Sequence, residues 1–332
     1  MNQTAVEYEE VVQKLRDVKN EISRYIVGQE QVIEELLWSI FSGGHAILEG
    51  LPGLGKTALI KTVAQVLDLS FSRIQFTPDL MPSDITGTLM LQPDELGKQQ
   101  FHFFHGPIFS QIVLADEINR ATPKTQSALL EAMAEKTVTI MGDTRQVETP
   151  FFVLATQNPI DLEGTYPLPE AQMDRFLSKI IVHYPTKAEL MEIVKRTEGE
   201  EPLLNKIMSS GDVLKAQSMM KDIMIADEVL ETAVQLISMT HPENEESPED
   251  VKKYIHYGSG PRGLQALIRL AKTRALMNGR FHVSVGDIKK VAPCVLRHRL
   301  FLNFEGEAAG IKSDDLLSVI ISEVKHGREV NR

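Results

Sequence analysis

A glycine-rich segment, Gly50–Thr57, carries the residues whose spacing points most directly to chemistry. It reads Gly-Leu-Pro-Gly-Leu-Gly-Lys-Thr and matches the phosphate-binding pattern G-x-x-x-x-G-K-[ST] at every specified position. Glycines allow tight turns that point consecutive backbone N–H groups at an anion. Lys56 is expected to reach the β- and γ-phosphates, and the Thr57 hydroxyl to take one position around Mg²⁺. The segment predicts a nucleotide site; the alternative is a glycine-rich turn with an unrelated lysine.

The neighbouring residues place this loop between a strand and a helix. His45–Glu49 contains a short apolar run, which predicts a buried strand, and apolar residues recur at helical spacing after Thr57. A helix N-terminus there also favours phosphate through its dipole. The residues of this segment that we assign to nucleotide binding are Leu51, Pro52, Gly53, Leu54, Gly55, Lys56, Thr57 and Ala58.

Two carboxylates end a second strand, predicted over Gln111–Glu117. Asp116 is suited to hold Mg²⁺ through its water shell, where the metal bridges the β- and γ-phosphates. Glu117 is suited to orient and deprotonate the attacking water. An Asp-Glu pair after an apolar run is common by accident. Its position after Lys56 in an alternation of strands and helices favours the catalytic interpretation.

A polar amide ends a third predicted strand, Phe151–Ala155, which runs into Thr-Gln-Asn-Pro. Asn158 could hydrogen-bond the γ-phosphate or the attacking water, and a turn-forming Asn before Pro is the alternative. Two further strands are predicted over Arg73–Phe76 and Lys179–Tyr184. The strand–helix alternation predicts an α/β fold with a doubly wound parallel sheet, the architecture of P-loop NTPases.

Elements before and inside this sheet have separate signals. Helices are predicted over Tyr8–Tyr25 and Glu30–Phe41. Gly28 and Gln29, which lie between them, could line an adenine pocket, although a plain helix–helix turn explains them equally well. Two hairpins interrupt the alternation, and the first could instead be an edge hairpin that completes the sheet. The hairpins are predicted over Gly87–Leu91 with Lys98–Phe103 around the turn Pro93–Gly97, and over Thr137–Gln146 around Met141–Asp143.

From Lys187 onward the pattern predicts helices without strands, so we expect a nucleotide-binding core over 1–186 and a helical lid over 187–332. Ser284 and Ser313 are expected to be helix N-caps. Arg262 opens the helix Pro261–Asn278, where a cation opposes the helix dipole. Helix stability therefore does not explain Arg262, although an ordinary surface arginine remains the alternative. The remaining helices are predicted over Lys187–Arg196, Asp227–Thr240, Ser284–Arg297 and Ser313–Val324.

The composition narrows the class of protein. The 332 residues carry a net charge of −11, which argues against a protein whose main role is to coat nucleic acid. One cysteine, Cys294, excludes an intramolecular disulfide and a cysteine metal cluster. No signal peptide and no membrane-spanning run is recognisable, so a cytoplasmic protein is expected.

The sequence closely resembles the AAA+ ATPases of the MoxR family, over nearly the whole chain. The resemblance is carried by Gly50–Thr57, Leu114–Arg120, Ala155–Pro159 and Leu168–Phe176. It implies that Asp116 and Glu117 are the Walker B pair, that Asn158 is sensor 1 and that Arg175 is an arginine finger for the neighbouring subunit's nucleotide. It also implies that Arg262 is sensor 2 on the lid, acting on its own or on a neighbour's nucleotide.

The same resemblance implies ATP and Mg²⁺ as ligands and a homo-oligomeric ring, with six subunits expected. Similar proteins are chaperone-like remodellers that mature a client enzyme, often by helping metal insertion, together with a separate von Willebrand factor A domain protein. A ring helicase and a magnesium-chelatase-type motor are the rivals. A helicase would need cations at the inner hairpin tip, whereas this tip reads Met141-Gly142-Asp143, with Lys136 and Arg145 near its base.

Overall fold

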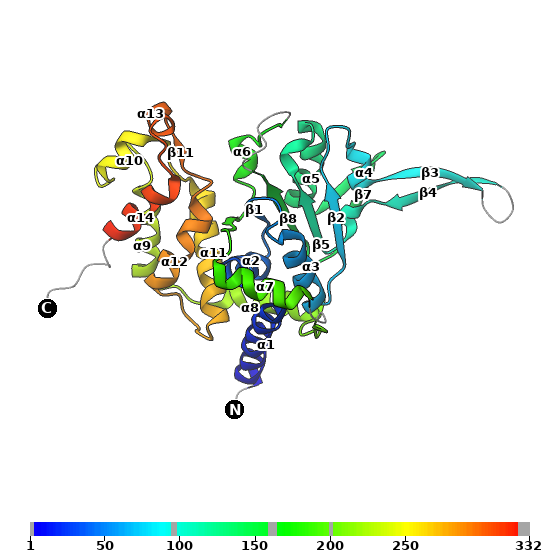
Figure 1. The fold of residues 1–332 in the computed structure, drawn as a ribbon, viewed down its shortest axis with the longest axis horizontal. Helices are drawn as coiled ribbons and strands as arrows, with labels where there is room; N and C mark the ends of the chain where they lie inside the picture. Colours follow the sequence, from blue (N-terminus) through cyan, green and yellow to red (C-terminus); the bar gives the residue numbers. More distant parts are fainter. Residues whose placement is uncertain (1–2, 94–97, 159–164, 199–201, 325–332) are drawn as a thin grey trace.

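A five-stranded parallel sheet forms the centre of the protein in this computed structural model, which describes residues 3–93, 98–158, 165–198 and 202–324. The strand order is β2-β5-β8-β1-β9, and every pair of neighbours is parallel. The strands are β1 (Ala46–Glu49), β2 (Phe71–Gln75), β5 (Ile112–Asp116), β8 (Phe152–Gln157) and β9 (Ser178–Ile181). The predicted doubly wound α/β architecture is confirmed (Figure 1).

Alternate residues of the strands enter two separate cores, which is how a sheet covered on both faces is built. Leu48, Leu114 and Leu154 pack into one core and Ile47, Val113 and Val153 into the other. The first core includes α1 (Gln3–Tyr25), α2 (Glu30–Phe41) and α3 (Lys56–Val66), and the second includes α5 (Pro123–Glu135). Short helical segments join these layers, namely α4 (Pro82–Thr86), η1 (Pro107–Phe109), η2 (Ile118–Arg120) and α6 (Glu170–Met173).

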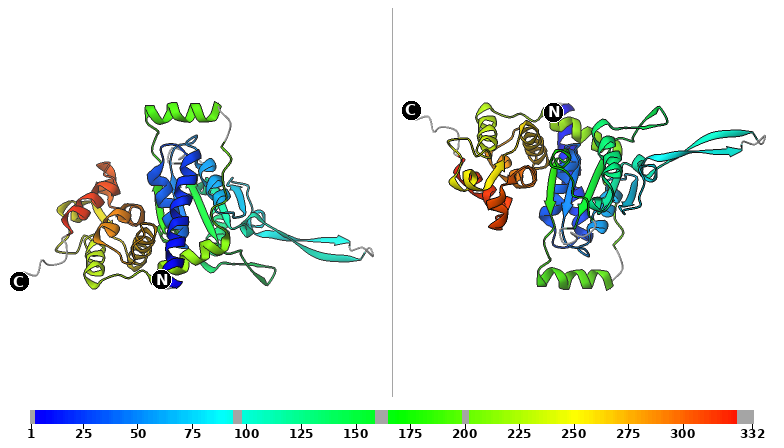
Figure 2. Two further views of the ribbon diagram at one scale, coloured as in Figure 1. Left: turned by 90° about the horizontal axis from the view of Figure 1, so that it is seen from below. Right: turned by 90° about the horizontal axis from the view of Figure 1, so that it is seen from above.

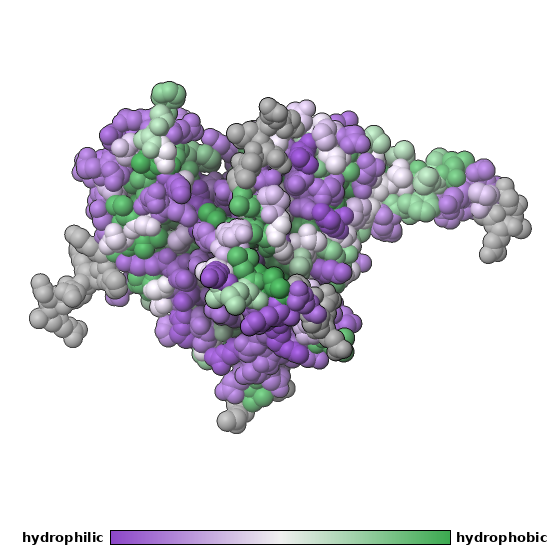
Figure 3. Space-filling model, viewed as in Figure 1, coloured by the Kyte–Doolittle hydropathy of each residue, from purple (hydrophilic) through white to green (hydrophobic). Residues whose placement is uncertain are grey.

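Both predicted hairpins are present. The first consists of β3 (Gly87–Pro93) and β4 (Gln99–His105), and it projects far from the sheet (Figures 1 and 2). The predicted turn at Pro93–Gly97 lies mostly outside the described residues. The second consists of β6 (Thr137–Ile140) and β7 (Asp143–Gln146). Along the first hairpin, apolar side chains remain exposed (Figure 3): Met90, Leu91, Phe101 and Phe104.

The C-terminal part is mostly helical, but the prediction that it has no strands is wrong. Two short strands, β10 (Ile255–Tyr257) and β11 (Phe301–Leu302), pair antiparallel. They are too short to carry a detectable period-two pattern. The helices are α7 (Lys187–Glu198), α8 (Ser210–Asp222), α9 (Asp227–Ser238), α10 (Glu249–Tyr254), α11 (Pro261–Met277), α12 (Val285–Leu296), α13 (Phe304–Ala308) and α14 (Ser313–Glu323).

One of the two predicted N-caps is confirmed. The Ser284 hydroxyl accepts a hydrogen bond from the Asp287 N–H, and the Asp287 carboxylate accepts one from the Ser284 N–H, which is a capping box. Ser313 is instead the first residue of α14, and Lys312 with φ −103° and ψ 139° is its N-cap. The extended backbone of Lys312 moves the helix start by one residue. None of the helices in the described part of the chain is long and apolar enough to cross a membrane.

Candidate nucleotide site

The phosphate-loop candidate connects the end of β1 at Glu49 to the start of α3 at Lys56. Gly53 and Gly55 have φ values of 81° and 75°, a backbone conformation that favours glycine. Open space lies in front of both, because a Cβ added at either position would meet no heavy atom within 4 Å. The Lys56 ammonium donates to the Gly50 carbonyl at 2.8 Å and so holds the loop closed on itself. The loop has the form and the free space of an anion cradle.

The two carboxylates lie at the same edge of the sheet, on the tip of β5, and the hydroxyl of Thr156 on β8 joins them. This hydroxyl donates to Asp116 Oδ1 at 2.6 Å and accepts from the Glu117 N–H at 2.8 Å. Glu117 has φ 57° and ψ 49°, a left-handed conformation uncommon for a residue other than glycine. Such conformations persist where the surrounding contacts enforce them, often at functional sites.

Strand β2 supplies partners from the other side. Arg73 donates to Asp116 Oδ2 through Nη2 at 2.6 Å and through Nε at 3.1 Å. Gln75 Nε2 donates to Glu117 Oε2 at 2.9 Å, and Arg120 Nη1 reaches the same oxygen at 3.0 Å. Both oxygens of Asp116 therefore already accept hydrogen bonds in this state. A contact from Asp116 to a metal through water fits this arrangement better than direct coordination.

Electrostatics connects the loop to the carboxylates. Burial lowers the pKa of Lys56, and the negative charges of Asp116, Glu117 and Glu49 act in the opposite direction. The lysine and the two acids are therefore close enough to interact through their charges. Asn158 joins this edge, because Glu49 of β1 is in register with Gln157 of β8. Its position is one residue beyond that pair, beside the start of the loop.

A cavity of about 530 Å³ lies beside the loop. Gln29 contributes to its wall and donates from Nε2 to the Leu54 carbonyl at 3.1 Å. Gly28 has φ 68°, a backbone conformation that favours glycine, and a Cβ there would lie 2.3 Å from the Glu189 side chain, which would have to move. The opposite wall comes from α7, through Leu190, Ile193 and Arg196. The loop residues that line the cavity are Pro52, Gly53, Leu54, Gly55 and Ala58.

The two predicted arginines lie elsewhere. Arg175 and Arg262 line a second cavity, of about 370 Å³, together with His45, which immediately precedes β1. Since strands rise about 3.3 Å per residue, His45 and Gly50 at the two ends of β1 are roughly 17 Å apart. The Arg175 guanidinium donates to the Leu130 carbonyl at 2.9 Å, and Arg262 Nη1 lies 3.6 Å from Asp174 Oδ2. The predicted site residues therefore separate into two groups. One lies at the carboxyl ends of the parallel strands and the other at their amino ends.

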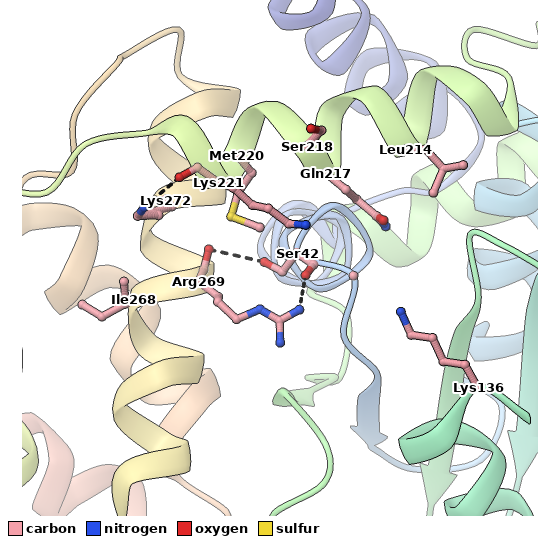
Figure 4. A pocket seen from close by; sticks show the side chains of 11 residues that line it. Ser42, Lys136, Leu214, Gln217, Ser218, Met220, Lys221, Ile268, Arg269 and Lys272 are labelled. Atoms are coloured by element: carbon pink, nitrogen blue, oxygen red, sulfur yellow. Dashed lines mark hydrogen bonds between the residues drawn. The ribbon is translucent and has the colours of Figure 1, made fainter.

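A third cavity, of about 550 Å³, shares Arg269 with the second and is shown in Figure 4. Arg269 of α11 donates to the carbonyl of Ser42, the C-cap of α2. Lys272 donates to the Lys221 carbonyl in the last turn of α8 at 3.0 Å. Cations are favourable at helix C-termini. These two residues thereby join the lid helix α11 to α2 and α8.

Sequence reasoning missed several residues of these sites. They are Arg73, Gln75 and Thr156 at the carboxylates, and Asp174 and Arg299 beside the arginines. A usable signal existed for the first group. Arg73 and Gln75 alternate along a strand whose partner in register ends in Asp116, and Thr156 is a polar residue at the end of an apolar run.

Comparison with known proteins decides the family. Residues 45–178 match the "ATPase family associated with various cellular activities (AAA)", and residues 247–320 match the "AAA lid domain". The chain is 42% identical to "Chaperone MoxR1" of Mycobacterium tuberculosis over 304 residues, which cover 92% of this chain and 80% of that protein. The chain belongs to the MoxR family of AAA+ ATPases. A second relative, the uncharacterized YeaC of Bacillus subtilis, is 40% identical over 92% of both chains.

A solved structure supports the same assignment. This MoxR-family chain superimposes on a candidate ATPase from Cytophaga hutchinsonii with a TM-score of 0.90 and 41% identity, over 97% of each chain. The α/β AAA+ core and the helical lid are thus shared with a relative of similar length. The family and the fold support ATPase activity and nucleotide binding by this chain.

The donor set at the candidate site fits Mg²⁺. Thr57 at the start of α3 offers an oxygen ligand of the kind this ion prefers, and Asp116 at the end of β5 could hold a water bound to it. Within the described residues, no three His, Cys, Asp or Glu side chains gather into a metal site of their own. A magnesium ion here would therefore depend on phosphate oxygens and water for most of its ligands, as is usual in nucleotide sites.

Proposed function

We propose that the protein hydrolyses ATP, with Mg²⁺, at sites that two neighbouring subunits of a homo-oligomeric ring build together. The observation that carries this proposal is the separation of the site residues. Lys56 and Glu117 lie at the carboxyl ends of the strands, and Arg175 and Arg262 line a cavity at the amino ends. A single subunit cannot bring both groups to one triphosphate, whereas a head-to-tail contact in a ring can.

Within one subunit, the loop N–H groups and Lys56 hold the phosphates, while Thr57 and Asp116 hold Mg²⁺. When bound there, Mg²⁺ would supply positive charge to offset the negative charge that develops on the phosphates. Glu117 takes the proton of the attacking water, and Asn158 orients that water. Gly28, Gln29 and the cavity beside the loop receive the adenine. Thr156 holds the two acids in register from β8.

The neighbouring subunit supplies Arg175 as the arginine finger and Arg262 as sensor 2, both in trans. Supplied arginines of this kind are worth about 10³–10⁵ in rate for related hydrolases. The 67% exposure of the Arg262 side chain supports a partner outside its own subunit. Hydrolysis would then change contacts between rigid bodies and move the hairpins with the ring.

We further propose a chaperone-like role in the cytoplasm. A hexameric ring would remodel a client enzyme, assisting its maturation or metal insertion, together with a separate von Willebrand factor A domain protein. Support comes from the relative described as "Chaperone MoxR1" and from two relatives named "Protein MoxR", of which the one from Methylorubrum extorquens is 29% identical over 91% of this chain. The division into a core over 1–186 and a lid over 187–332 belongs to this proposal.

Mixed rings test the shared site. Lys56→Ala should lack ATP binding but keep its arginines, and Arg175→Ala should bind ATP but lack the finger. Each variant alone should release no phosphate in a steady-state assay. In an equal mixture of the two, about a quarter of the interfaces join an intact loop to an intact finger, so about a quarter of wild-type turnover should return. A mixture as inactive as its components would contradict the shared site.

A helicase-like motor remains the second candidate because it shares both hairpins. The exposed tip residue Met141 and the stacking of Arg145 on Phe103, at 4.2 Å from the ring centre, do not favour it. Phosphate release measured with and without single-stranded DNA distinguishes the two. Stimulation of several fold by the DNA would favour the helicase, and an unchanged rate the remodeller. A magnesium-chelatase-type motor would also be insensitive to DNA.

A further inference from the structure

A buried arginine of the lid, Arg299, holds the loop that carries the proposed finger. Its side chain is 4% exposed and lies just beyond α12. Nε donates to Asp174 Oδ1 at 2.8 Å, and Nη2 donates to the carbonyls of Asp174 at 3.2 Å and Phe176 at 2.7 Å. Nη1 donates to the Leu177 carbonyl at 3.3 Å. The acceptors lie on both sides of Arg175 in the chain.

The same carboxylate connects the two arginines of the lid. Asp174 Oδ1 accepts from Arg299, and Asp174 Oδ2 lies 3.6 Å from Arg262 Nη1. The adjacent residue His298 adds a contact between its Nε2 and the Phe176 carbonyl, at 3.1 Å. One continuous network therefore runs from the base of the finger residue, through Asp174, to sensor 2.

The geometry of this contact needs arginine. A guanidinium presents its donors in a planar fork and can reach several acceptors in fixed directions, which an ammonium cannot do. A buried ion pair is also weak evidence for a purely stabilising role, because apolar residues of similar volume often stabilise a fold as well. The donors of Arg299 reach three residues that flank Arg175, namely Asp174, Phe176 and Leu177. Nη1 also donates to the Val295 carbonyl in the last turn of α12.

We propose that Arg299 is a positioning residue for ATP hydrolysis in the neighbouring subunit, an inference that rests on the shared site proposed above. Arg299 fixes the backbone on both sides of Arg175 and, through Asp174, fixes Arg262 relative to it. The lid and the finger loop then behave as one rigid body, so both arginines reach the neighbour's phosphates together. If the contacts of Arg299 are lost, the finger Arg175 can move independently of sensor 2, Arg262.

The test is Arg299→Lys, which keeps the charge and removes the fork. The phosphate loop and the cavity beside it are unchanged in this variant, so its affinity for ATP should change by less than about twofold. Its kcat should fall about 10- to 100-fold, as for residues that orient a catalytic group. In equal mixture with Lys56→Ala, turnover should return to about a quarter of wild type. The reason is that the Lys56→Ala subunits keep Arg299 and therefore a correctly positioned Arg175.

Two controls keep the result interpretable. Arg274→Lys disturbs a comparable cluster, in which Arg274 and Arg280 both bind the fully buried Asp287, but the ion pairs of this cluster all lie within residues 274–287. It should lower thermal stability and leave kcat within about twofold, as expected for a site outside the network. If Arg299→Lys fails to fold, Asp174→Asn replaces it, because that change removes the charge and leaves the backbone acceptors.

The outcomes separate the two proposals. Restored turnover with Lys56→Ala supports positioning. No restoration by Arg299→Lys or Asp174→Asn, while Arg175→Ala is restored in the same assay, overturns it, as does an equal loss of kcat in Arg274→Lys. If Arg175→Ala is itself not restored, the shared site fails and this inference fails with it.

Discussion

Thr156 shows how much at this site depends on a single hydroxyl. It is fully buried, and it bonds both the Asp116 carboxylate and the Glu117 N–H. The proposed metal carboxylate and the proposed base are therefore held by one side chain of the neighbouring strand. Because Glu117 is in the left-handed region, its backbone depends on that contact more than an ordinary strand end would.

Thr156→Val keeps the shape of the side chain and removes the hydroxyl. A lost hydrogen bond to a charged group costs about 1.5–3 kcal/mol, which corresponds to a fall in kcat of about 10- to 100-fold. ATP affinity should change little because the loop is intact. Steady-state kinetics and nucleotide binding measure both. Thr232→Val, at a buried threonine of α9 that bonds the Glu228 carbonyl, is the matched control and should leave kcat unchanged.

The residues with the clearest chemistry could be predicted from the sequence because each lies in a contiguous motif. Lys56 completes a glycine-rich phosphate-loop pattern, and Asp116 and Glu117 end an apolar run. Thr156, Arg73 and Gln75 are different, since their function depends on β2 and β8 lying on either side of β5. The order of strands in a parallel sheet depends on long-range packing, which no local pattern specifies.

At the scale of elements, His45, which lies just before β1, should make the folded protein less stable in acid. Burial lowers the pKa of His45 from its ordinary 6.5 to about 4. The ring is neutral in the folded protein, where Nδ1 accepts from the Val153 N–H at 3.0 Å and Nε2 contacts the Met133 carbonyl at 3.2 Å. Between these pH values the unfolded chain binds a proton that the folded chain does not.

Protonation therefore favours unfolding, and the free energy of unfolding should fall as the pH drops from 6.5 to 4, by about 2–3 kcal/mol from His45 alone. Burial also lowers the pKa of His298, so it acts in the same direction. Urea unfolding across this pH range measures the slope. His45→Asn, which cannot titrate, should show a shallower slope, and an identical slope would assign the effect to other groups.

Two phenylalanines on one face of the first hairpin differ in how far they are exposed and packed. Phe101 is 67% exposed, whereas Phe103, two residues further along β4, contacts the ring of Phe109 at 5.7 Å and lies under Arg145. Phe101→Ser should leave the unfolding temperature within about 2 °C, because little apolar area is lost, while Phe103→Ser should lower it by several degrees. Thermal unfolding compares the two. An equal loss in both would mean that the hairpin tip is buried in solution.

Element prediction succeeded where a pattern was long or bounded by turns. The helix Pro123–Glu135 has the predicted ends because Pro123 suits a first turn. It failed for β10 and β11, which contain three and two residues, and for α8, whose apolar positions are few. Its buried residues are Val213, Ala216 and Met220, so the helix shows only a narrow apolar stripe.

At the scale of the whole molecule, the sequence left open which subunit Arg262 serves. The residue type and its place at the start of a helix were visible, but the position of the lid was not. That position depends on contacts such as Arg269 with Ser42 and Arg299 with residues 174–177, which join segments more than a hundred residues apart. Side-chain contacts between distant segments have no signature in a single sequence.

Assembly should depend on ATP because both arginines would gain a phosphate partner only across the interface. Binding and assembly are linked, so whatever ATP adds to the contact strengthens association by the same factor. In Glu117→Gln, where ATP should persist, sedimentation should show the ring at protein concentrations about tenfold or more below those needed without nucleotide, as one or two charged contacts would give. Adding Arg175→Ala to that variant should remove most of the shift without weakening ATP binding to the single subunit. Equal assembly with and without ATP would mean that the arginines do not reach the neighbour's phosphates, even though they lie apart from the phosphate loop of their own subunit.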